Sequence, residues 1–454
     1  MLFQLPSFLL FFTAFVAGLL LCPAALRQAY VIAASLFFYA WWYPPFLLVL
    51  IGLVVLAWAG SRLVERNHGW LPLAVVLALL PLGLFKYADF LLATLEDLTG
   101  VRLGHLGWPL PLGISFVTFT VISLIVDITR RRGERAPTFG ETALYITLFP
   151  HLIAGPILRP HQMIPQLPQL RFDWGAFAPN LALFAVGMAK KVLVADPIAR
   201  HVDASYANAA SVGGWEALLA MFGFAIQIYC DFSAYSDMAI ALAGMLGIAF
   251  PENFRSPYMA TSMTELWQRW HMTLSFWLRD YVFRPLHARL HHYSRYAAVV
   301  LTMTISGLWH GAAWTFVVWG LALGCIMAAE VASGYSKYAR GASGPARWAC
   351  ICATFLCWVV TVSTFRAPDF ASAVDIYMGA FGVRGWGEWP AGAGTILGLG
   401  TAVLAMHPFD QVPRIRAAAV RVPAAMSVPI LLMAIATLAV IAAGRPESFY
   451  YFEF

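Results

Sequence analysis

Long apolar stretches recur from one end of the chain to the other. They cover residues 5–21, 30–58, 71–84, 181–194, 215–229, 297–331, 348–362, 395–405 and 428–443. A helix needs about 20 apolar residues to cross a bilayer, so some stretches are too short to span alone and others are long enough to turn back. We therefore expect an all-α, polytopic membrane protein of about ten to twelve helical segments, some re-entrant or amphipathic, in one domain over residues 1–454.

Composition and charge agree with this pattern. Hydrophobic residues make up 61% of the 454 residues and charged residues 11%, against roughly 25% charged residues in an average soluble domain. The first positive charge, Arg27, follows the first apolar stretch. This order favours an outside N-terminus, and the stretch does not resemble a cleavable signal peptide. Basic clusters mark expected cytoplasmic loops: Arg130, Arg131, Arg132 and Arg135; Arg284, Arg289 and Arg295; Lys337, Arg340 and Arg347; Arg414, Arg416 and Arg421. These loops account for the net charge of +6, so we expect a bilayer and no nucleic-acid partner.

Three segments interrupt the apolar pattern with polar residues, prolines and glycines. They span residues 145–170, 226–258 and 264–286. Backbone that breaks a helix at membrane depth is tolerated only where protein or a water-filled cavity covers it. We therefore expect these segments to build an internal cavity. Asp231 and Asp237, in the second segment, would either line that cavity or cap broken helices.

The third segment, TELWQRWHMTLSFWLRDYVFRPL, places tryptophans at helical spacing. On a helical wheel Trp267 and Trp270 fall on one broad face, whereas Gln268 and Ser275 fall on another. This pattern predicts an amphipathic helix with His271 at the border between the two faces. Polar neighbours could orient the imidazole there while one ring nitrogen remains available for chemistry. The alternative is an interfacial helix whose Trp and Arg side chains anchor at lipid headgroups.

A second histidine, His310, is the only ionisable residue in TISGLWHGAAWTFVVWG, residues 304–320. Ionisable groups at membrane depth are costly and usually face a cavity. The small residues Gly307 and Gly311 would let a slender substrate approach the imidazole. They also form a G-x-x-x-G pattern, which is typical of close helix packing. A buried, hydrogen-bonded structural histidine is the competing interpretation of His310.

The two histidine segments together resemble the membrane-bound O-acyltransferase family. The resemblance lies in LWQRWHMTLSFWLRDYVFRPL followed by GLWHGAAWTFVVWG, and similar stretches extend along most of the chain in matching order: LFPHLIAGPILRP, GMAKKVLVADPIA, IYCDFSAYSDMAIALAGMLGI, PENFRSPY and the tail SFYYFEF. The bacterial branch it resembles includes alginate-acetylating and teichoic-acid D-alanylating members. The resemblance implies a multi-helix fold around a central tunnel, with His310 as the catalytic residue and His271 as its companion.

Acyl transfer from a thioester to a hydroxyl fits these residue types. The reaction needs a base of near-neutral pKa, which histidine supplies, and hydrogen-bond donors for the developing oxyanion. Those donors could be an indole N–H, Ser306 or backbone amides near Gly307. Candidate substrate-binding or tunnel-lining residues are Trp309, Ser306, Gln268, Arg269, Asp231 and Asn253. Arg269, Arg279 and Arg284 could bind phosphates of coenzyme A or of a phosphopantetheine carrier, although anchoring at headgroups is equally compatible.

We expect an enzyme of the bacterial inner membrane that binds no resident cofactor. The resemblance implies that it moves an acetyl group from a cytoplasmic thioester such as acetyl-CoA toward hydroxyls of an exported polysaccharide, through a periplasmic SGNH-type acetyltransferase or accessory protein. The segment RWHMTLSFW leans toward D-alanylation from a carrier protein, which is the alternative. A membrane transporter and a purely structural scaffold are alternatives of other classes, and the absence of visible internal repeats weakens the first. His287, His291 and His292 do not have a spacing that predicts a metal site.

Overall fold

The computed structural model describes residues 1–130, 135–289 and 294–450, and these are helical with no strand. The predicted all-α class is therefore confirmed. Helices long and apolar enough to cross a membrane number six in the described residues: 46–66, 68–99, 214–245, 314–332, 344–366 and 424–444. Shorter apolar helical stretches cover 6–21, 24–40 and 393–409. The predictions for Arg131, Arg132, His291, His292 and residues 451–454 lie outside the described residues.

The chain is cut into more pieces than the expected ten to twelve segments, because turns and π-helical segments divide the long apolar stretches. The described residues contain 23 α-helices. The chain also separates into two compact units. One unit contains Met1–Ala185, Tyr235–Pro251 and Val422–Glu453, and the other contains Val186–Ala234 and Glu252–Arg421. The expectation of a single domain stays a prediction.

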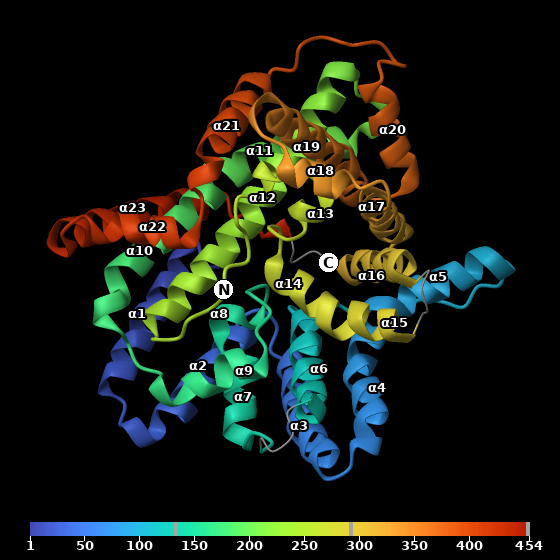
Figure 1. Ribbon diagram of the computed structural model, residues 1–454. Helices are drawn as coiled ribbons and strands as arrows, with labels where there is room; N and C mark the ends of the chain where they lie inside the picture. The colour runs from blue at the N-terminus through green and yellow to red at the C-terminus, as the bar shows by residue number, and fades with distance from the viewer. Residues whose placement is uncertain (131–134, 290–293, 451–454) are drawn as a thin grey trace. The chain divides into compact units, whose positions relative to one another are not determined.

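The first unit is built mainly from the N-terminal helices. Its helices are α1 (Pro6–Leu21), α2 (Arg27–Ala40), α3 (Phe46–Arg66), α4 (Leu71–Leu82), the π-helix η3 (Gly83–Tyr87), α5 (Ala88–Thr99), α6 (Ile114–Arg130), α7 (Phe139–Thr147), α8 (Phe149–Leu152), α9 (Pro160–Met163), most of α10 (Trp174–Ala189) and α23 (Ala424–Gly444). Helices α3, α4 and α6 pack against one another (Figure 1). Helix α6 is buried on nearly every side although it carries serines and threonines. It tolerates them because hydroxyls such as those of Thr120 and Ser123 donate to carbonyls one turn earlier.

The second unit contains both histidine segments. Its elements are the π-helix η5 (Lys190–Ala195), α11 (Asp196–Ala207), the first part of α12 (Gly214–Met245), α13 (Met263–Leu266), α14 (Met272–Leu278), the π-helix η8 (Arg279–Phe283), α15 (Arg284–Arg289), α16 (Ser294–His310), α17 (Trp314–Ala332), α18 (Tyr335–Gly341), α19 (Gly344–Arg366), α20 (Phe370–Ala380), α21 (Ala393–Met406) and α22 (Val412–Val420). Helices α16 and α17 form a tightly packed hairpin (Figure 1).

Local sequence explains many helix ends. Prolines stand in the first turn of α1, α19 and α22, where their missing N–H has no intrahelical partner to lose. Gly100 ends α5 and Gly334 follows α17, both with positive φ, which glycine adopts without steric cost. Helix α7 begins with a capping box, in which the Thr138 hydroxyl and the Glu141 carboxylate each accept from the other residue's backbone N–H.

Two expectations about broken helices are corrected by the structure. Residues 226–245 do not break but continue α12, a helix of 32 residues that is almost entirely buried. Asp231 is tolerated there because Lys191 neutralises its charge. Neither Asp231 nor Asp237 caps a helix, since both lie inside α12. The segment 264–286, by contrast, is not one amphipathic helix. It consists of α13, a turn over residues 267–271, α14, η8 and the start of α15.

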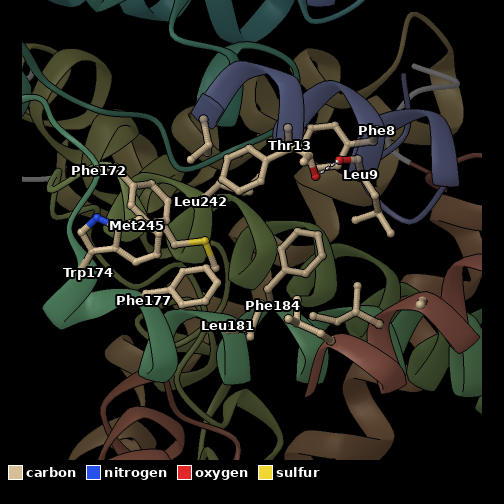
Figure 2. A pocket seen from close by; sticks show the side chains of 15 residues that line it. Phe8, Leu9, Thr13, Phe172, Trp174, Phe177, Leu181, Phe184, Leu242 and Met245 are labelled. Atoms are coloured by element: carbon tan, nitrogen blue, oxygen red, sulfur yellow. Dashed lines mark hydrogen bonds between the residues drawn. The ribbon is translucent and has the colours of Figure 1, made fainter. Parts of the chain in front are cut away.

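A lateral pocket of about 390 Å³ opens in the first unit (Figure 2). Its lining is apolar apart from Thr13, and its aromatic members are Phe8, Phe12, Phe172, Trp174, Phe177 and Phe184. Two backbone hydrogen bonds fix one wall: Arg171 N–H donates to Leu246 O at 3.3 Å, and Asp173 N–H donates to Met245 O at 2.8 Å. The pocket carries no ionisable side chain in its lining, so it has no group that could anchor a charged ligand.

The glycines around His310 serve helix packing. A Cβ at Gly307 would lie 2.2 Å from Phe316 O and 2.9 Å from Gly320 Cα, and a Cβ at Gly311 would lie 2.1 Å from the Phe316 ring. Space beside these glycines is therefore filled by α17 and is not open to a substrate. The G-x-x-x-G interpretation is the one that the structure supports.

We predict that Gly307→Ala lowers the free energy of unfolding by about 1–3 kcal/mol, because the added methyl group would overlap α17 backbone. Thermal or denaturant unfolding of the purified protein in detergent measures this change. Gly398→Ala is the matched control, since no atom lies within 4 Å of the added Cβ. Equal stability of the two variants would contradict the packing role of Gly307.

Candidate functional site

His310 is the last residue of α16, where the hairpin turns toward α17, and its side chain is buried. Aromatic rings surround the imidazole. The Trp309, Trp319 and Phe365 rings have centroids 4.9, 5.5 and 5.4 Å from the His310 ring, each in an edge-to-face arrangement. Edge-to-face contacts are a favourable arrangement for pairs of aromatic rings. The cage excludes solvent from the His310 imidazole.

Hydrogen-bonding groups without a protein partner lie on the elements that form this cage. Ser306, one helical turn before His310, is fully buried, and its Oγ has no partner in the described part of the chain. The same holds for the Nε1 of Trp319, whose ring contacts His310, and for the Thr315 hydroxyl on the first turn of α17. Buried polar atoms are nearly always satisfied in folded proteins, so such a group indicates a place for a polar ligand or water. Ser306 and Trp319 are therefore the best-placed donors beside His310.

His271 owes its position to an unusual backbone conformation. It precedes α14 with φ 42° and ψ 53°, a left-handed conformation that is uncommon for residues other than glycine. Two backbone hydrogen bonds hold this turn against residues 253–255: Met272 N–H donates to Asn253 O at 2.8 Å, and Arg255 N–H donates to Arg269 O at 2.9 Å. Strained residues of this kind persist only where the surroundings hold them in place, and they cluster at functional sites.

The Asn253 side chain determines which nitrogen of His271 carries the proton. Asn253 Oδ1 lies 3.1 Å from His271 Nδ1, and it also accepts from Thr273 N–H at 3.2 Å and from the Thr273 hydroxyl at 2.8 Å. Because a backbone N–H can only donate, the Asn253 atom at this point is the carbonyl oxygen. His271 Nδ1 must then be the donor, so in neutral imidazole the lone pair is on Nε2. Burial lowers the pKa of His271 to about 3, which keeps the ring neutral.

The rings of the two predicted histidines both lie close to the ring of Trp309. The ring centroids of His271 and Trp309 are 6.2 Å apart, and those of Trp309 and His310 are 4.9 Å apart. On its other side His271 packs edge-to-face on Phe232 of α12, at 4.6 Å. Residues 39 positions apart in the sequence thus share one buried aromatic cluster. Whether a tunnel opens between them stays a prediction.

A carboxylate from α17 holds the start of the His271 segment. Glu330 accepts hydrogen bonds from Met263 N–H, Thr264 N–H and the Thr264 hydroxyl, at 2.7–2.9 Å. A negative charge at these N–H groups is favourable, because they are the unpaired donors at a helix start. No local pattern predicts this contact, since Glu330 lies 66 residues from Thr264 inside an apolar stretch. The backbone N–H and the hydroxyl of Thr264 therefore both donate to Glu330.

Two predicted site residues lie apart from the histidine rings. The Gln268 side chain is exposed, whereas both imidazoles are buried. Arg269 forms an ion pair with Glu265 at 2.8 Å, and its guanidinium also donates to Arg255 O. Both placements follow from the turn over residues 267–271, which breaks the helical spacing assumed from the sequence. Arg269 supports the turn that presents His271.

Asp231 participates in a buried ion-pair network on the same unit. Lys191 Nζ lies 2.7 Å from Asp231 Oδ1 and 2.8 Å from Asp196 Oδ1. Lys191 belongs to the π-helix η5, and the two carboxylates come from α12 and α11. Removing one partner of a buried ion pair usually costs several kcal/mol because a charge is left uncompensated. Asp231 therefore holds η5 to α12, and the next residue, Phe232, is the one that contacts His271.

A second carboxylate organises the arginines of η8 and α15. Asp280 is buried and lies 2.9 Å from Arg279 Nε and 3.0 Å from Arg284 Nη1. Both guanidinium groups remain about half exposed or more. The three groups together carry one net positive charge, and the arginines keep donors directed at solvent. Arg279 and Arg284 are thus the predicted phosphate-binding residues that the structure brings together, and Arg269 is not with them.

Two further histidines are buried, and the sequence did not single them out. His151 lies in the first unit, with Nε2 2.8 Å from Tyr145 O. His407 accepts from Tyr258 N–H at 2.9 Å. A backbone partner is typical of a structural histidine. No group of three or more His, Cys, Asp or Glu residues in the described ranges is placed to hold a metal ion.

Fold and site together define a multi-pass α-helical membrane protein with a pair of buried histidines. Residues 128–339 match the family model of MBOAT, the membrane-bound O-acyltransferase family. The chain is 37% identical to the probable alginate O-acetylase AlgI of Pseudomonas aeruginosa over 422 residues, which cover 89% of this chain and 80% of that protein. It is 32% identical to the peptidoglycan O-acetyltransferase of Helicobacter pylori, over 79% of this chain and 74% of that protein. A teichoic acid D-alanyltransferase of Streptococcus thermophilus is 29% identical over 46% of this chain and 54% of that protein.

The protein is therefore a membrane-embedded O-acyltransferase. It belongs to the membrane-bound O-acyltransferase family. The matched family region contains His271 and His310, and with them Asn253, Lys191 and Asp280. Membership confirms the predicted enzyme class and favours it over a transporter or a structural scaffold.

We predict that Asn253→Ala lowers the free energy of unfolding by about 1–3 kcal/mol and reduces acyl transfer, because His271 and Thr273 lose a shared buried acceptor. Asn253→Asp keeps an acceptor oxygen. Its carboxylate would favour the imidazolium and raise the pKa of His271, so the acidic loss of activity would begin at a higher pH than in the unmodified protein. Unfolding curves and pH–rate profiles measure both effects. An unchanged pH profile in the folded Asp variant would contradict the contact between the two side chains.

Proposed function

We propose that the enzyme moves an acetyl group from a thioester donor to a hydroxyl group, with His310 as the general base and His271 as its companion. The observation that carries this proposal is that both imidazoles are buried against the same indole, Trp309, next to buried donors that have no partner within the described residues. This arrangement brings a proton acceptor and oxyanion donors together away from bulk water. Those are the groups that acyl transfer requires.

The reaction is a proton-balanced substitution at the thioester carbonyl. His310 takes the proton from the acceptor hydroxyl as the hydroxyl oxygen bonds to the carbonyl carbon. The carbon–sulfur bond then breaks, and the thiolate that leaves takes up the proton from the imidazolium. The products are an O-acetyl ester and a free thiol. His271, with its Nδ1 proton held by Asn253, presents Nε2 to position a substrate or relay a proton.

The negative charge on the tetrahedral intermediate would be stabilised by Ser306 and Trp319. The Ser306 hydroxyl is on the same helical face as His310, one turn earlier, and the Trp319 indole contacts the His310 ring. Removal of one such donor typically lowers the rate by about 10²–10³-fold in other acyl-transfer enzymes. Ser306 lies on α16 and Trp319 on α17, and these two helices approach closely at Gly307 and Gly320.

Acetyl-CoA is the proposed donor, bound as a substrate from the cytoplasmic side. Arg279 and Arg284 are the proposed contacts to its phosphates, because Asp280 orients both guanidinium groups while leaving them accessible. Arginine is well suited to phosphate because its planar fork can donate two hydrogen bonds. No resident cofactor is required by this chemistry. The proposed location is a bacterial inner membrane.

The proposed acceptor is an exported polysaccharide, reached through a periplasmic acetyltransferase. Relatives named as an alginate O-acetylase and a peptidoglycan O-acetyltransferase support a glycan acceptor. The loop after α20 offers a docking surface for the partner, since Phe381 is 82% exposed and Trp389 is 61% exposed. Its backbone is held in place: Gly214 N–H donates to Gly385 O at 3.0 Å, and Trp215 N–H donates to Trp386 O at 3.2 Å. A pre-ordered loop loses little entropy when a partner binds.

D-alanyl transfer from a carrier protein is the second candidate. The D-alanyltransferase of Streptococcus thermophilus supports it, but the match covers 46% of this chain, compared with 89% for the alginate O-acetylase. The two candidates share the histidine pair and differ in the donor. We therefore place acetyl transfer first.

We predict that His310→Ala lowers acetyl transfer by about 10²–10⁴-fold, because the variant lacks the general base. The amount of folded protein in the membrane should change little. Turnover of acetyl-CoA by the purified protein measures the effect, and His201→Ala, on α11 and half-buried, is the matched control. Activity that survives in a well-folded His310→Ala variant would move the catalytic role elsewhere.

We also predict that the purified protein alone turns over acetyl-CoA or exchanges the acetyl group, but acetylates polysaccharide only when the periplasmic partner is added. Reconstitution in vesicles with labelled acetyl-CoA checks this by following label in thiol, protein and glycan. Phe381→Ser should lower glycan acetylation without changing turnover of the thioester, since the side chain lies on the exposed loop. Efficient acetylation of a polysaccharide by this chain alone would overturn the relay.

A further inference from the structure

A second pocket of about 390 Å³ lies in the unit that contains the histidines, apart from the histidine pair. It is formed by the end of α10, α12, the end of α21 and α22. Its walls are mainly apolar and include Val186, Val403, Met406, Phe409, Ile415 and Ala418. Met406 is 64% exposed and Phe409 is 60% exposed, so this wall continues into the outer apolar surface of a membrane protein.

Charged groups are present at one end of this pocket. Lys190 Nζ lies 3.2 Å from Asp410 Oδ1, and the Tyr229 hydroxyl donates to Asp410 Oδ2 at 2.6 Å. The Lys190 ammonium also stands over the Tyr229 ring, 5.8 Å from its centroid. Lys190 and Asp410 neutralise each other. Arg414, exposed at the rim, therefore gives the pocket a net positive charge.

The short helix α22 supplies both the charge and an apolar wall. Its sequence VPRIRAAAV has Ile415 and Ala418 facing the pocket and contains no acidic residue. Arg414 and Arg416 lie on this helix, and Arg421 follows it. Basic residues beside a membrane helix attract anionic lipids, at about 1 kcal/mol per Lys or Arg. An apolar slot with a cationic rim is complementary to an anionic amphiphile.

We propose that this pocket binds one anionic phospholipid, with an acyl chain between α12, α21 and α22 and the phosphate against Arg414. The aromatic pocket of the first unit (Figure 2) has the same volume but no ionisable lining residue, so it should accept acyl chains without regard to headgroup. The lipid would also brace Tyr229, whose ring is 6.1 Å from that of Trp270, the neighbour of His271. The lipid site goes beyond the acyl-transfer proposal and does not depend on it.

The test is native mass spectrometry of the full chain in detergent, titrated with phosphatidylglycerol or phosphatidylcholine that carry identical acyl chains. The unmodified protein should retain one phosphatidylglycerol more tightly than phosphatidylcholine. Arg414→Gln should weaken phosphatidylglycerol binding about fivefold and leave phosphatidylcholine binding unchanged. Ala418→Trp, at an exposed rim position, should fill the slot and remove the tightly bound lipid while the charge stays in place.

Two controls separate this site from general attraction and from the other pocket. Arg421→Gln removes the same charge just beyond α22, outside the pocket lining, and should retain the bound lipid. Ala436→Trp fills the aromatic pocket of the first unit and should not change the preference for phosphatidylglycerol. Thermal unfolding shows whether each variant is folded. The proposal would be overturned if Arg414→Gln and Arg421→Gln weakened phosphatidylglycerol binding equally, or if only Ala436→Trp removed the bound lipid. It would also be overturned if the protein formed a dimer that Ala418→Trp dissociated.

Discussion

Oδ1 of Asn253 accepts hydrogen bonds from His271 and Thr273 in a region that solvent does not reach. A buried, apolar region offers few hydrogen-bond acceptors. A buried donor that has no acceptor lowers the stability of the folded protein. This oxygen sets the tautomer of the His271 ring, and together with the backbone hydrogen bonds of Met272 and Arg255 it holds the turn that carries the left-handed His271. The position of Trp270 and the contact of His271 with Trp309 follow from the same turn. The geometry of the histidine pair depends on that acceptor.

The same requirement for buried pairing explains the π-helical segments. Each of the three contains a buried ionisable group: Lys86 in η3, Lys191 in η5 and Asp280 in η8. A π-helical turn inserts an extra residue and so changes the direction in which the following side chains point. In η5 this brings Lys191 to two carboxylates, and in η8 it lets Asp280 orient two arginines. π-helical turns are frequent at functional sites, and two of these three, η5 and η8, lie in the unit that contains the histidine pair.

Around His310, some residues pack the helices and rings closely, and others keep hydrogen-bonding groups without a partner in the described residues. Gly307 and Gly320 let α16 and α17 approach closely, and the rings of Trp319 and Phe365 pack around the imidazole. Against this fixed background, Ser306 and Trp319 keep hydrogen-bonding capacity that the described protein does not use. A site of this kind is pre-organised for charge that develops during a reaction, since its donors need not reorient. Burying such polar groups without hydrogen-bond partners lowers the stability of the fold.

The sequence by itself determined that this is an all-α membrane protein and that it resembles the membrane-bound O-acyltransferases. It also identified the two histidines. Apolar stretches long enough to cross a bilayer predict where helices lie, because a bilayer sets the length of any helix that spans it. His310 is recognisable because an ionisable residue stands out in an apolar stretch, and Asn253 is among the candidate substrate-binding or tunnel-lining residues. Helical periodicity failed for residues 264–286, because Glu330, Asn253 and Asp280 supply partners that make a broken backbone favourable. The expectation that polar residues interrupt the helix was wrong for residues 226–245, where Lys191 neutralises Asp231 within an unbroken helix. Only the tertiary structure decided these points, since each depends on a partner distant in the chain whose approach no local pattern encodes.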